Sequence, residues 1–402
     1  MRESFSPRRG LPFAMPRSPF SLKGLRWFEL DWHVLGLATL LLALGVTFVG
    51  AMAAADELLE RNSVSLDDHL TKLVFALPAF AVGLALRPRW MRKHAWLIYT
   101  VFTGILLLLP FIGTVRNGAR RWIHLPGLFD LQPSELTKIA LVLVLARVLY
   151  RNRLERLRDW GPPLLAALFP MALVAKQPDL GTAMSFVPIA LGMLYLAGAK
   201  GKVIVRFLIG AALIGVLAWQ FQVGVKGYQV QRLETWSNSF AAEDLIADRN
   251  GPAFHSYHAR VAIGNGGMFG TGIGDGIANR TGILPERDCD SVFAVVAEEL
   301  GWVMTSGVML LYVLMIALML GSASGIRDRF SRLAAGGIAM YFTAHFVINV
   351  GVNLGLLPMT GITLPFFSTG GSSLMTTFLA LGIVVGLSAH SEPALDKDAF
   401  QA

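Results

Sequence analysis

The sequence predicts an all-α polytopic membrane protein with about ten transmembrane helices and a large extracytoplasmic loop between helices 7 and 8. Of its 402 residues, 54% are hydrophobic and only 15% are charged, and the mean hydropathy is +0.55. A soluble domain of this length needs more polar surface to cover its core. Apolar stretches of about 20 residues, each able to cross about 30 Å of hydrocarbon, recur along the chain.

The charge distribution, the cysteine count and the N-terminal sequence argue against nucleic-acid binding, an internal disulfide and a cleavable signal peptide, respectively. The formal net charge of +8 alone would suit a nucleic-acid-binding protein, but its distribution fits the positive-inside rule of membrane proteins, so no nucleic-acid partner is expected. Cys289 is the single cysteine, which rules out an internal disulfide. The polar, basic first 30 residues run into the first apolar stretch without a small-residue cleavage site, so we expect no cleavable signal peptide.

The apolar stretches define the individual elements. In chain order, the ten expected spans are 33–54, 71–87, 95–114, 136–150, 161–176, 181–198, 203–221, 292–321, 333–356 and 371–390. Together they form one membrane domain over residues 33–390.

Positive charge on alternate connections predicts the orientation. Basic residues cluster in segments 1–32, 87–93, 147–158, 200–206 and 327–332. The positive-inside rule places these segments in the cytoplasm. With ten spans, the basic N-terminal segment 1–32 and the C-terminal tail 391–402 both lie in the cytoplasm, and the protein is a multi-pass component of the cytoplasmic (inner) membrane.

The opposite, extracytoplasmic side receives segments 55–70, 115–135, 177–181, 222–291 and 357–370. The connection 222–291 is the only one long enough to form its own structure outside the membrane. Its stretch from Gly264 to Gly282 contains eight glycines. Such a run suits tight turns and close backbone approach, and it also suits a flexible linker.

The first outer segment with unexpected charge contains Arg120 and Arg121, followed by Glu135 and Lys138 at the start of a predicted helix. Glu135 and Lys138 are three residues apart, so they share one helix face. One interpretation is a capping and salt-bridge device. The other is that the cations hold an anionic group near the membrane surface, since guanidinium groups make bidentate contacts with phosphate.

The second such segment is the short turn that contains Lys176 and Asp179. Pro178 ends one helix and Asp179 can cap the next, which needs no further function. Charges close to hydrocarbon are costly, however, and usually pair or line a wet cavity.

The third segment enters the eighth span and contains Glu286, Asp288 and Asp290, with Glu298 and Glu299 about two turns deeper. Carboxylates at a helix N-terminus interact favourably with the helix dipole, which is the structural interpretation of Asp288 and Asp290. A carboxylate that faces a partly dehydrated cavity can instead have a raised pKa and act as a general base. Spacing does not choose among Glu286, Asp288, Asp290 and Glu298.

The fourth segment, 355–373, contains two prolines, a Gly-Gly pair and several hydroxyls, Ser368 and Ser372 among them. It predicts an irregular loop that dips into the membrane, and such backbone is tolerated at depth only inside protein or along a cavity. A polar stripe of His345, Asn349 and Asn353 precedes it at four-residue spacing. Interhelical hydrogen bonds are its structural interpretation.

These four segments together resemble the shape, elongation, division and sporulation (SEDS) family, typified by RodA and FtsW. The resemblance rests on GARRWI with QPSELTK, then QPDLGTA, then GNGGMFGTGIG with LPERDCD and FAVVAEELG, then LLPMTGITLPFFSTGGSS, all in the family's order over residues 33–390. It implies ten spans, cytoplasmic termini and polymerisation of lipid II into glycan strands. It also implies a class B penicillin-binding transpeptidase as partner within the elongation or division machinery.

The resemblance also assigns roles to individual residues. Asp290, four residues after the Glu of LPE, is the expected catalytic base for the acceptor hydroxyl. The leaving group is undecaprenyl diphosphate, so Arg120, Arg121, Lys138 and Lys176 become candidate pyrophosphate ligands. The other candidate substrate-binding residues are Glu135, Asp179, Glu286, Glu298, Ser368 and Ser372. A divalent cation, Mg or Mn, can neutralise part of the negative charge of the diphosphate, although no motif here identifies a metal site.

The sequence departs from the family pattern around Asp290 and on the ninth span. Asp288, Cys289 and Ser291 replace the usual His, Thr and Phe, and His345 stands where Gln is expected. Met359-Thr360-Gly361-Ile362 is more similar to the RodA branch than to FtsW, which favours a role in cell elongation. A lipid II flippase and a non-catalytic scaffold for the transpeptidase are the competing hypotheses.

Overall fold

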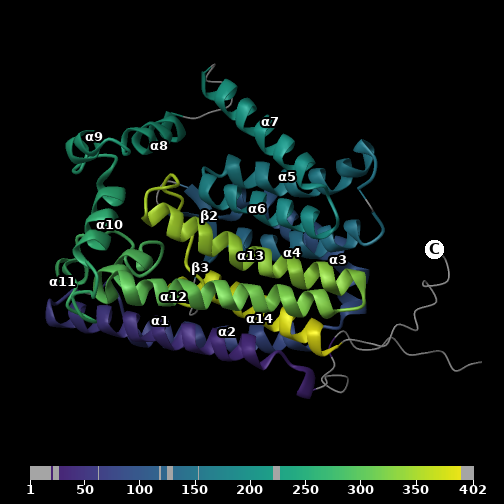
Figure 1. Ribbon diagram of the computed structural model, residues 1–402, viewed down its shortest axis with the longest axis horizontal. Coiled ribbons are helices and arrows are strands. Elements are labelled where there is room, and N and C mark those ends of the chain that lie inside the picture. Colours follow the sequence, from purple (N-terminus) through teal and green to yellow (C-terminus); the bar gives the residue numbers. More distant parts are fainter. Residues whose placement is uncertain are drawn as a thin grey trace, which may run out of the picture.

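The computed structural model is a bundle of long helices with a smaller helical region at one end (Figure 1). It describes residues 20, 27–61, 63–116, 119–124, 130–152, 154–220 and 227–390. The tail 391–402 and most of the N-terminal segment 1–32 therefore lie outside the described residues, and so does any test of their location.

Ten helices coincide with the ten expected spans. In chain order they are α1 (Trp32–Leu58), α2 (Leu66–Ala85), α3 (Pro88–Ile112), α4 (Pro133–Leu149), α5 (Gly161–Lys176), α6 (Leu180–Leu196), α7 (Gly201–Gln220), α12 (Val292–Gly325), α13 (Arg329–Asn353) and α14 (Gly371–Ala389). Within the described chain, six of them are long and apolar enough to cross a membrane by length and composition, namely α1, α2, α3, α12, α13 and α14. The prediction of a polytopic helical membrane protein is confirmed.

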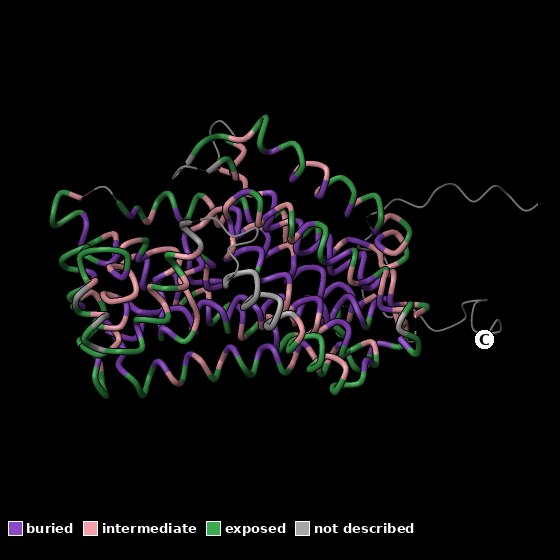
Figure 2. The backbone as a smooth tube through the Cα atoms, turned by 90° about the horizontal axis from the view of Figure 1, so that it is seen from above, coloured by how far each residue is buried: buried purple, intermediate pink, exposed green. Residues whose placement is uncertain are grey.

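Burial separates an inner group of helices from an outer set. Most residues of α4, α13 and α14 are buried, whereas α1, α2, α3 and α12 leave large apolar side chains exposed along their length. Figure 2 shows the buried backbone at the centre and exposed turns along the periphery. Because the exposed residues of the outer helices are apolar, they suit contact with lipid.

The region between α7 and α12 is helical and lies at the end of the bundle where α12 begins (left in Figure 1). It contains α8 (Gly227–Asn238), α9 (Ala242–Ala247), α10 (Phe254–Asn265) and α11 (Ile277–Thr281). A small apolar cluster joins it to α12 and consists of Ala259, Ala262, Ala278, Leu284, Ala294 and Val295. The described part of the long predicted loop 222–291 therefore forms four helices, of which α10 and α11 pack on α12.

The segment between α3 and α4 adds a small sheet to the helical fold. It forms a small antiparallel sheet in the order β1-β2-β3, with β1 at Thr114–Arg116, β2 at Ala119–His124 and β3 at Asp130–Leu131. The strands are too short for an apolar alternation that would reveal them in the sequence.

The glycine-rich stretch packs its backbone against a break in α12. Gly301 has φ 70° and ψ 179° within the helix, which frees backbone groups there. Thr271 N donates to the Glu298 carbonyl at 3.0 Å, and Trp302 N donates to the Gly267 carbonyl at 2.9 Å. A Cβ atom at Gly270 or Gly301 would overlap the facing backbone. Of the two interpretations of this stretch, close backbone approach is therefore confirmed.

Candidate active site

The segment that precedes α12 is a compact turn that presents three carboxylates. The amides of Cys289 and Ser291 both donate to the Glu286 carbonyl, at 3.0 and 3.1 Å, and Glu286 itself has a φ of 46°. The turn brings the carboxyl groups of Glu286 and Asp288 close to one another beside Cys289, whereas the carboxyl group of Asp290 lies beside His255 of α10.

The polar stripe of α13 holds the backbone at Asp290. The side-chain amides of Asn349 and Asn353 each donate to the Asp290 carbonyl at 2.9 Å. Asn349 also donates to the Ile362 carbonyl at 2.7 Å, in the irregular loop between α13 and α14. The stripe therefore joins the turn before α12 to this loop.

The same loop also forms hydrogen bonds with the turn through Ser368 and Thr369. The Ser368 hydroxyl donates to the Cys289 carbonyl at 2.6 Å and accepts from the Leu364 amide at 3.0 Å. The Thr369 amide donates to the Asp288 carbonyl at 2.9 Å, and its hydroxyl donates to the Asp288 carboxylate. Ser368, a candidate substrate-binding residue, is buried here and positions the turn.

The carboxyl group of Asp290 is almost enclosed but incompletely hydrogen-bonded. Its side chain is 12% exposed, and its buried Oδ1 atom has no hydrogen-bond partner. Burial, together with the nearby charges of Glu286 and Asp288, raises the pKa of Asp290 to about 7, although Arg232 acts in the opposite direction. A carboxyl group that titrates near neutral pH can accept a proton during a reaction and release it afterwards.

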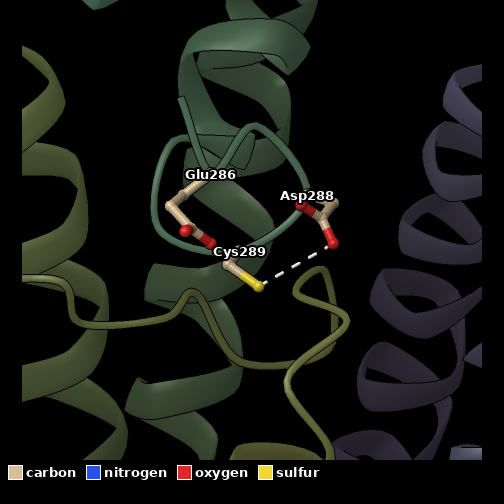
Figure 3. A group of neighbouring side chains, drawn as sticks. All are labelled: Glu286, Asp288 and Cys289. Carbon is tan, nitrogen blue, oxygen red and sulfur yellow. Dashed lines mark hydrogen bonds between the residues drawn. The ribbon is translucent and has the colours of Figure 1, made fainter. Parts of the chain in front are cut away.

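Glu286, Asp288 and Cys289 place one potential metal-ligand atom each within 4.8 Å of the others, and Figure 3 shows the two carboxyl groups on either side of Cys289. Burial and the neighbouring carboxylates raise the pKa of the Cys289 thiol, so it stays protonated at neutral pH. A protonated thiol is a poor ligand, and Asp288 already accepts a hydrogen bond from Thr369. The group therefore does not fit a three-ligand metal site.

Glu135 and Lys138 share a helix face as expected and lie inside the bundle. The fully buried Lys138 ammonium donates to Glu135 Oε1 and contacts His345 Nε2, both at 2.7 Å. His345 Nδ1 lies 3.2 Å from the Thr363 carbonyl, so its Nδ1–H donates there and Nε2 accepts from Lys138. The salt-bridge interpretation is confirmed for this pair, and the pair supports the irregular loop through His345.

The two arginines of β2 take different partners. Arg120 is exposed and donates to the Pro110 carbonyl at 3.0 Å. Arg121 lies 3.5 Å from Asp179 Oδ2, which also accepts from the Gln132 side chain at 3.1 Å. Asp179 caps α6 by accepting from the Thr182 amide at 3.1 Å, as the turn interpretation expected.

Two further candidates lie near this sheet and at the end of α5. The Ser372 hydroxyl accepts from the Gln132 amide at 2.7 Å and donates to the Asp130 carbonyl at 2.8 Å, so it fastens β3 to α14. Lys176 is the last residue of α5 and is exposed. Arg120 and Lys176 are therefore the more accessible cations of the predicted anion-binding set.

Glu298 has a structural role, because both of its carboxylate oxygens accept hydrogen bonds from the protein. Its two carboxylate oxygens accept from the Asn265 side chain at 3.2 Å and from the Ala278 amide at 2.9 Å. The side chain is fully buried and ties the glycine-rich stretch to α12. It differs in this respect from Asp290, which has a buried oxygen without a donor.

Sequence reasoning missed three residues that shape this region. Arg287 is buried and forms an ion pair with Asp56 of α1, while its other guanidinium nitrogen donates to the Asn279 carbonyl at 2.6 Å. His255 of α10 lies 3.8 Å from Asp290 Oδ1, and Arg232 of α8 acts on the charge of Asp290. The ion pair joins residues 231 positions apart, and no local spacing reveals it.

The fold and the site together define a polytopic helical membrane protein with a titratable carboxyl group in a polar site at one end of the bundle. Comparison with known proteins gives the family. The model of the cell cycle proteins FtsW, RodA and SpoVE matches residues 31–393. The chain belongs to this family, and the expectation from its motifs is confirmed.

Individual relatives carry names from both branches. The chain is 32% identical to the probable peptidoglycan glycosyltransferase FtsW of Trichlorobacter lovleyi, over 82% of this chain and 86% of that protein. It is 33% identical to the peptidoglycan glycosyltransferase MrdB of Escherichia coli K12, over 81% of this chain and 86% of that protein.

Solved structures agree with the family assignment. A chain described under "Structural coordination of polymerization and crosslinking by a peptidoglycan synthase complex" has a TM-score of 0.76 and 30% identity, covering 92% of this chain and 100% of that one. The rod shape determining protein RodA of Thermus thermophilus has a TM-score of 0.67 and 27% identity, covering 91% of this chain and 99% of that one.

Proposed function

We propose that this chain is a peptidoglycan glycosyltransferase that polymerises lipid II into glycan strands at the outer face of the cytoplasmic membrane, with Asp290 as the catalytic base. Family membership and the names of its relatives support the enzyme class. The observation that carries the role of Asp290 is its nearly buried carboxyl group, with one oxygen unpaired and a pKa of about 7.

The reaction that this site supports is a displacement at an anomeric carbon. Asp290 accepts the proton of the acceptor sugar hydroxyl, whose oxygen forms a bond with the anomeric carbon of the donor. The bond from that carbon to the diphosphate oxygen breaks, and undecaprenyl diphosphate leaves with the electron pair. Arg120 and Lys176 are the exposed cations of the candidate set, and in this proposal they meet the developing negative charge.

The remaining candidates support these groups. Arg121 and Asp179 orient the sheet against α6, the Glu135–Lys138 pair holds the loop through His345, and Ser368 holds the turn at Cys289.

We further propose that the protein acts in cell elongation, as RodA-like enzymes do, with a septal, FtsW-like role as the alternative. Relatives of both names match the chain at similar identity, so the preference rests on Met359-Thr360-Gly361-Ile362. The likeness to a complex that combines polymerisation with crosslinking supports a class B penicillin-binding transpeptidase as partner. Both termini are placed in the cytoplasm because of the charge pattern.

The test is glycan synthesis by purified protein in proteoliposomes with lipid II, with and without the transpeptidase. We expect long glycans from the wild type and a loss of about 10²- to 10⁴-fold in rate for Asp290→Ala, because the catalytic base is missing. Asp275→Ala is the matched control, since Asp275 is an exposed carboxylate of the same region paired with Arg280. Unchanged polymerisation by Asp290→Ala would exclude this role for Asp290.

The same vesicles distinguish the competing hypotheses. Head-group translocation without polymer would favour a flippase, and a protein that stimulates the transpeptidase without producing polymer would favour a scaffold. In each case the variant Asp290→Ala is measured beside the wild type.

A further inference from the structure

The two carboxylate oxygens of Asp290 have different surroundings. Oδ1 is buried, accepts no hydrogen bond, and lies 3.8 Å from Nε2 of His255. Oδ2 faces the irregular loop, where a Cβ atom at Gly361 would lie 3.6 Å away. The 12% exposure of the side chain therefore falls on atoms other than Oδ1.

His255 is held close to Asp290 by its own contacts. Its Nε2 atom is hydrogen-bonded to the hydroxyl of Ser291, the residue that follows Asp290. Its helix, α10, is fixed at the other end by Asn265 on Glu298 and in the middle by Arg260, which donates to the Ser239 carbonyl at 2.7 Å. In the tautomer that carries the proton on Nε2, a small change in the ring orientation would move Nε2–H from the Ser291 hydroxyl into hydrogen-bond range of Asp290 Oδ1.

We propose that His255 is the positioning residue for the catalytic carboxylate: its Nε2–H turns from Ser291 to donate to Oδ1 of Asp290, and so leaves Oδ2 to take the proton of the acceptor hydroxyl. This inference rests on the function proposed above. It assigns different tasks to the two oxygens, and it gives the orphaned buried oxygen a donor when the carboxylate carries its charge.

The surrounding charges agree with this assignment. Glu286 and Asp288 lie on the same turn as Asp290, Arg232 faces it from α8, and Asn349 and Asn353 of α13 are neutral and committed to its carbonyl. Burial and Arg232 lower the pKa of His255 to about 4, so the ring is neutral at physiological pH and carries one N–H. It therefore acts as a hydrogen-bond donor and not as a fixed charge.

The experiment is the pH dependence of glycan synthesis from lipid II by the full chain in proteoliposomes, for wild type, His255→Ala and His255→Gln. We expect the wild-type rate to rise with pH through a midpoint near 7, the pKa of Asp290, because the ionised carboxylate is the active form. His255→Ala should lower the rate by up to about 100-fold, because the Asp290 carboxylate is no longer held in the orientation that faces the acceptor hydroxyl.

The decisive readout is the midpoint. Without a donor to Oδ1 the ionised carboxylate is less stable, so the midpoint of His255→Ala should move upward by about one pH unit. His255→Gln retains an N–H donor and should return both the midpoint and the rate toward the wild type. His258→Ala, a substitution on the same helix, is the matched control and should leave the midpoint unchanged.

Two results would overturn the inference. One is a lower rate in His255→Ala with the wild-type midpoint, since that pattern indicates a purely structural role. The other is equal behaviour of His255→Ala and His255→Gln. Both are distinct from failure of the proposed function, in which Asp290→Ala itself retains polymerisation.

Discussion

Two carboxylates eight residues apart in the sequence have opposite situations in the structure. Glu298 is fully buried, and both of its oxygens accept hydrogen bonds that fasten the glycine-rich stretch to the break in α12. Asp290 is almost as enclosed, but its Oδ1 atom has no partner. Hydrogen bonds to both oxygens of a buried carboxylate stabilise its ionised form and the local structure, whereas a buried carboxylate oxygen without a donor makes ionisation costly. Glu298 therefore belongs to a region that stabilises the fold and Asp290 to the proposed reaction site, although the two residues lie on one short stretch of the chain.

The largest loss of stability is expected at the helix break. Gly301→Ala introduces a side chain at φ 70°, where it overlaps the backbone of Gly270. Positive φ and overpacking each cost about 1–3 kcal/mol, so the thermal stability in detergent should fall sharply. Gly307→Ala, in the same helix with open space around its Cβ position, is the control and should melt close to the wild type. Equal melting temperatures for the two variants would show that the break does not depend on glycine.

The next largest effect is expected beneath the active-site turn. Arg287→Ala leaves the buried Asp56 without its main partner, and breaking such a pair should cost about 3 kcal/mol, since Arg61 still lies 3.2 Å from Asp56. Arg280→Ala removes an exposed pair with Asp275 and should cost less than about 1 kcal/mol. Thermal unfolding of both variants measures the difference, and similar losses would mean that Asp56 is rehydrated when Arg287 is removed.

A smaller loss is expected for Glu298→Ala. The substitution leaves the Ala278 amide and the Asn265 side chain without their acceptors, at a cost of about 1–3 kcal/mol. Polymerisation by the folded fraction should persist, because Glu298 does not belong to the reacting groups. Glu57→Gln, on an exposed residue, serves as the control. A fully folded Glu298→Ala protein without activity would contradict the structural role assigned to Glu298.

Hydropathy predicts the spans well, and the reason is physical. A run of about 20 apolar residues has few alternatives to a membrane helix, so all ten ranges coincide with helices. Boundaries differ where polar residues extend a helix, as in α1, which continues to Leu58. The strands β1–β3 pair locally but are too short to show an apolar alternation, and the break at Gly301 depends on backbone contacts with the glycine-rich stretch, which the local sequence does not encode.

The site was predicted only as a shortlist. Carboxylates in the outer segment that enters the eighth span gave Asp290 together with Glu286, Asp288 and Glu298, and the family resemblance selected Asp290. What distinguishes Asp290 from Glu298 is whether donors from α10 and α11 reach the carboxylate, and residues from so far along the chain cannot be placed by spacing. His255 and Arg287 went unassigned for the same reason.

The variant that tests the comparison most directly is Asp290→Asn, whose effect on stability depends on pH. The pKa of Asp290 is about 7 in the folded protein against 3.8 for an ordinary Asp, so the folded state holds a proton that the unfolded state has released between those values. Wild-type stability therefore decreases as pH rises from about 4 to about 7, and the full penalty is present above pH 7. Asparagine carries no such penalty, so Asp290→Asn should melt above the wild type at pH 8 and close to it at pH 4. Asp275→Asn, on an exposed carboxylate, should show no such pH-dependent gain. If Asp290→Asn were instead destabilised at pH 8, the carboxylate would be stabilising the fold as Glu298 does, and the two regions would not differ.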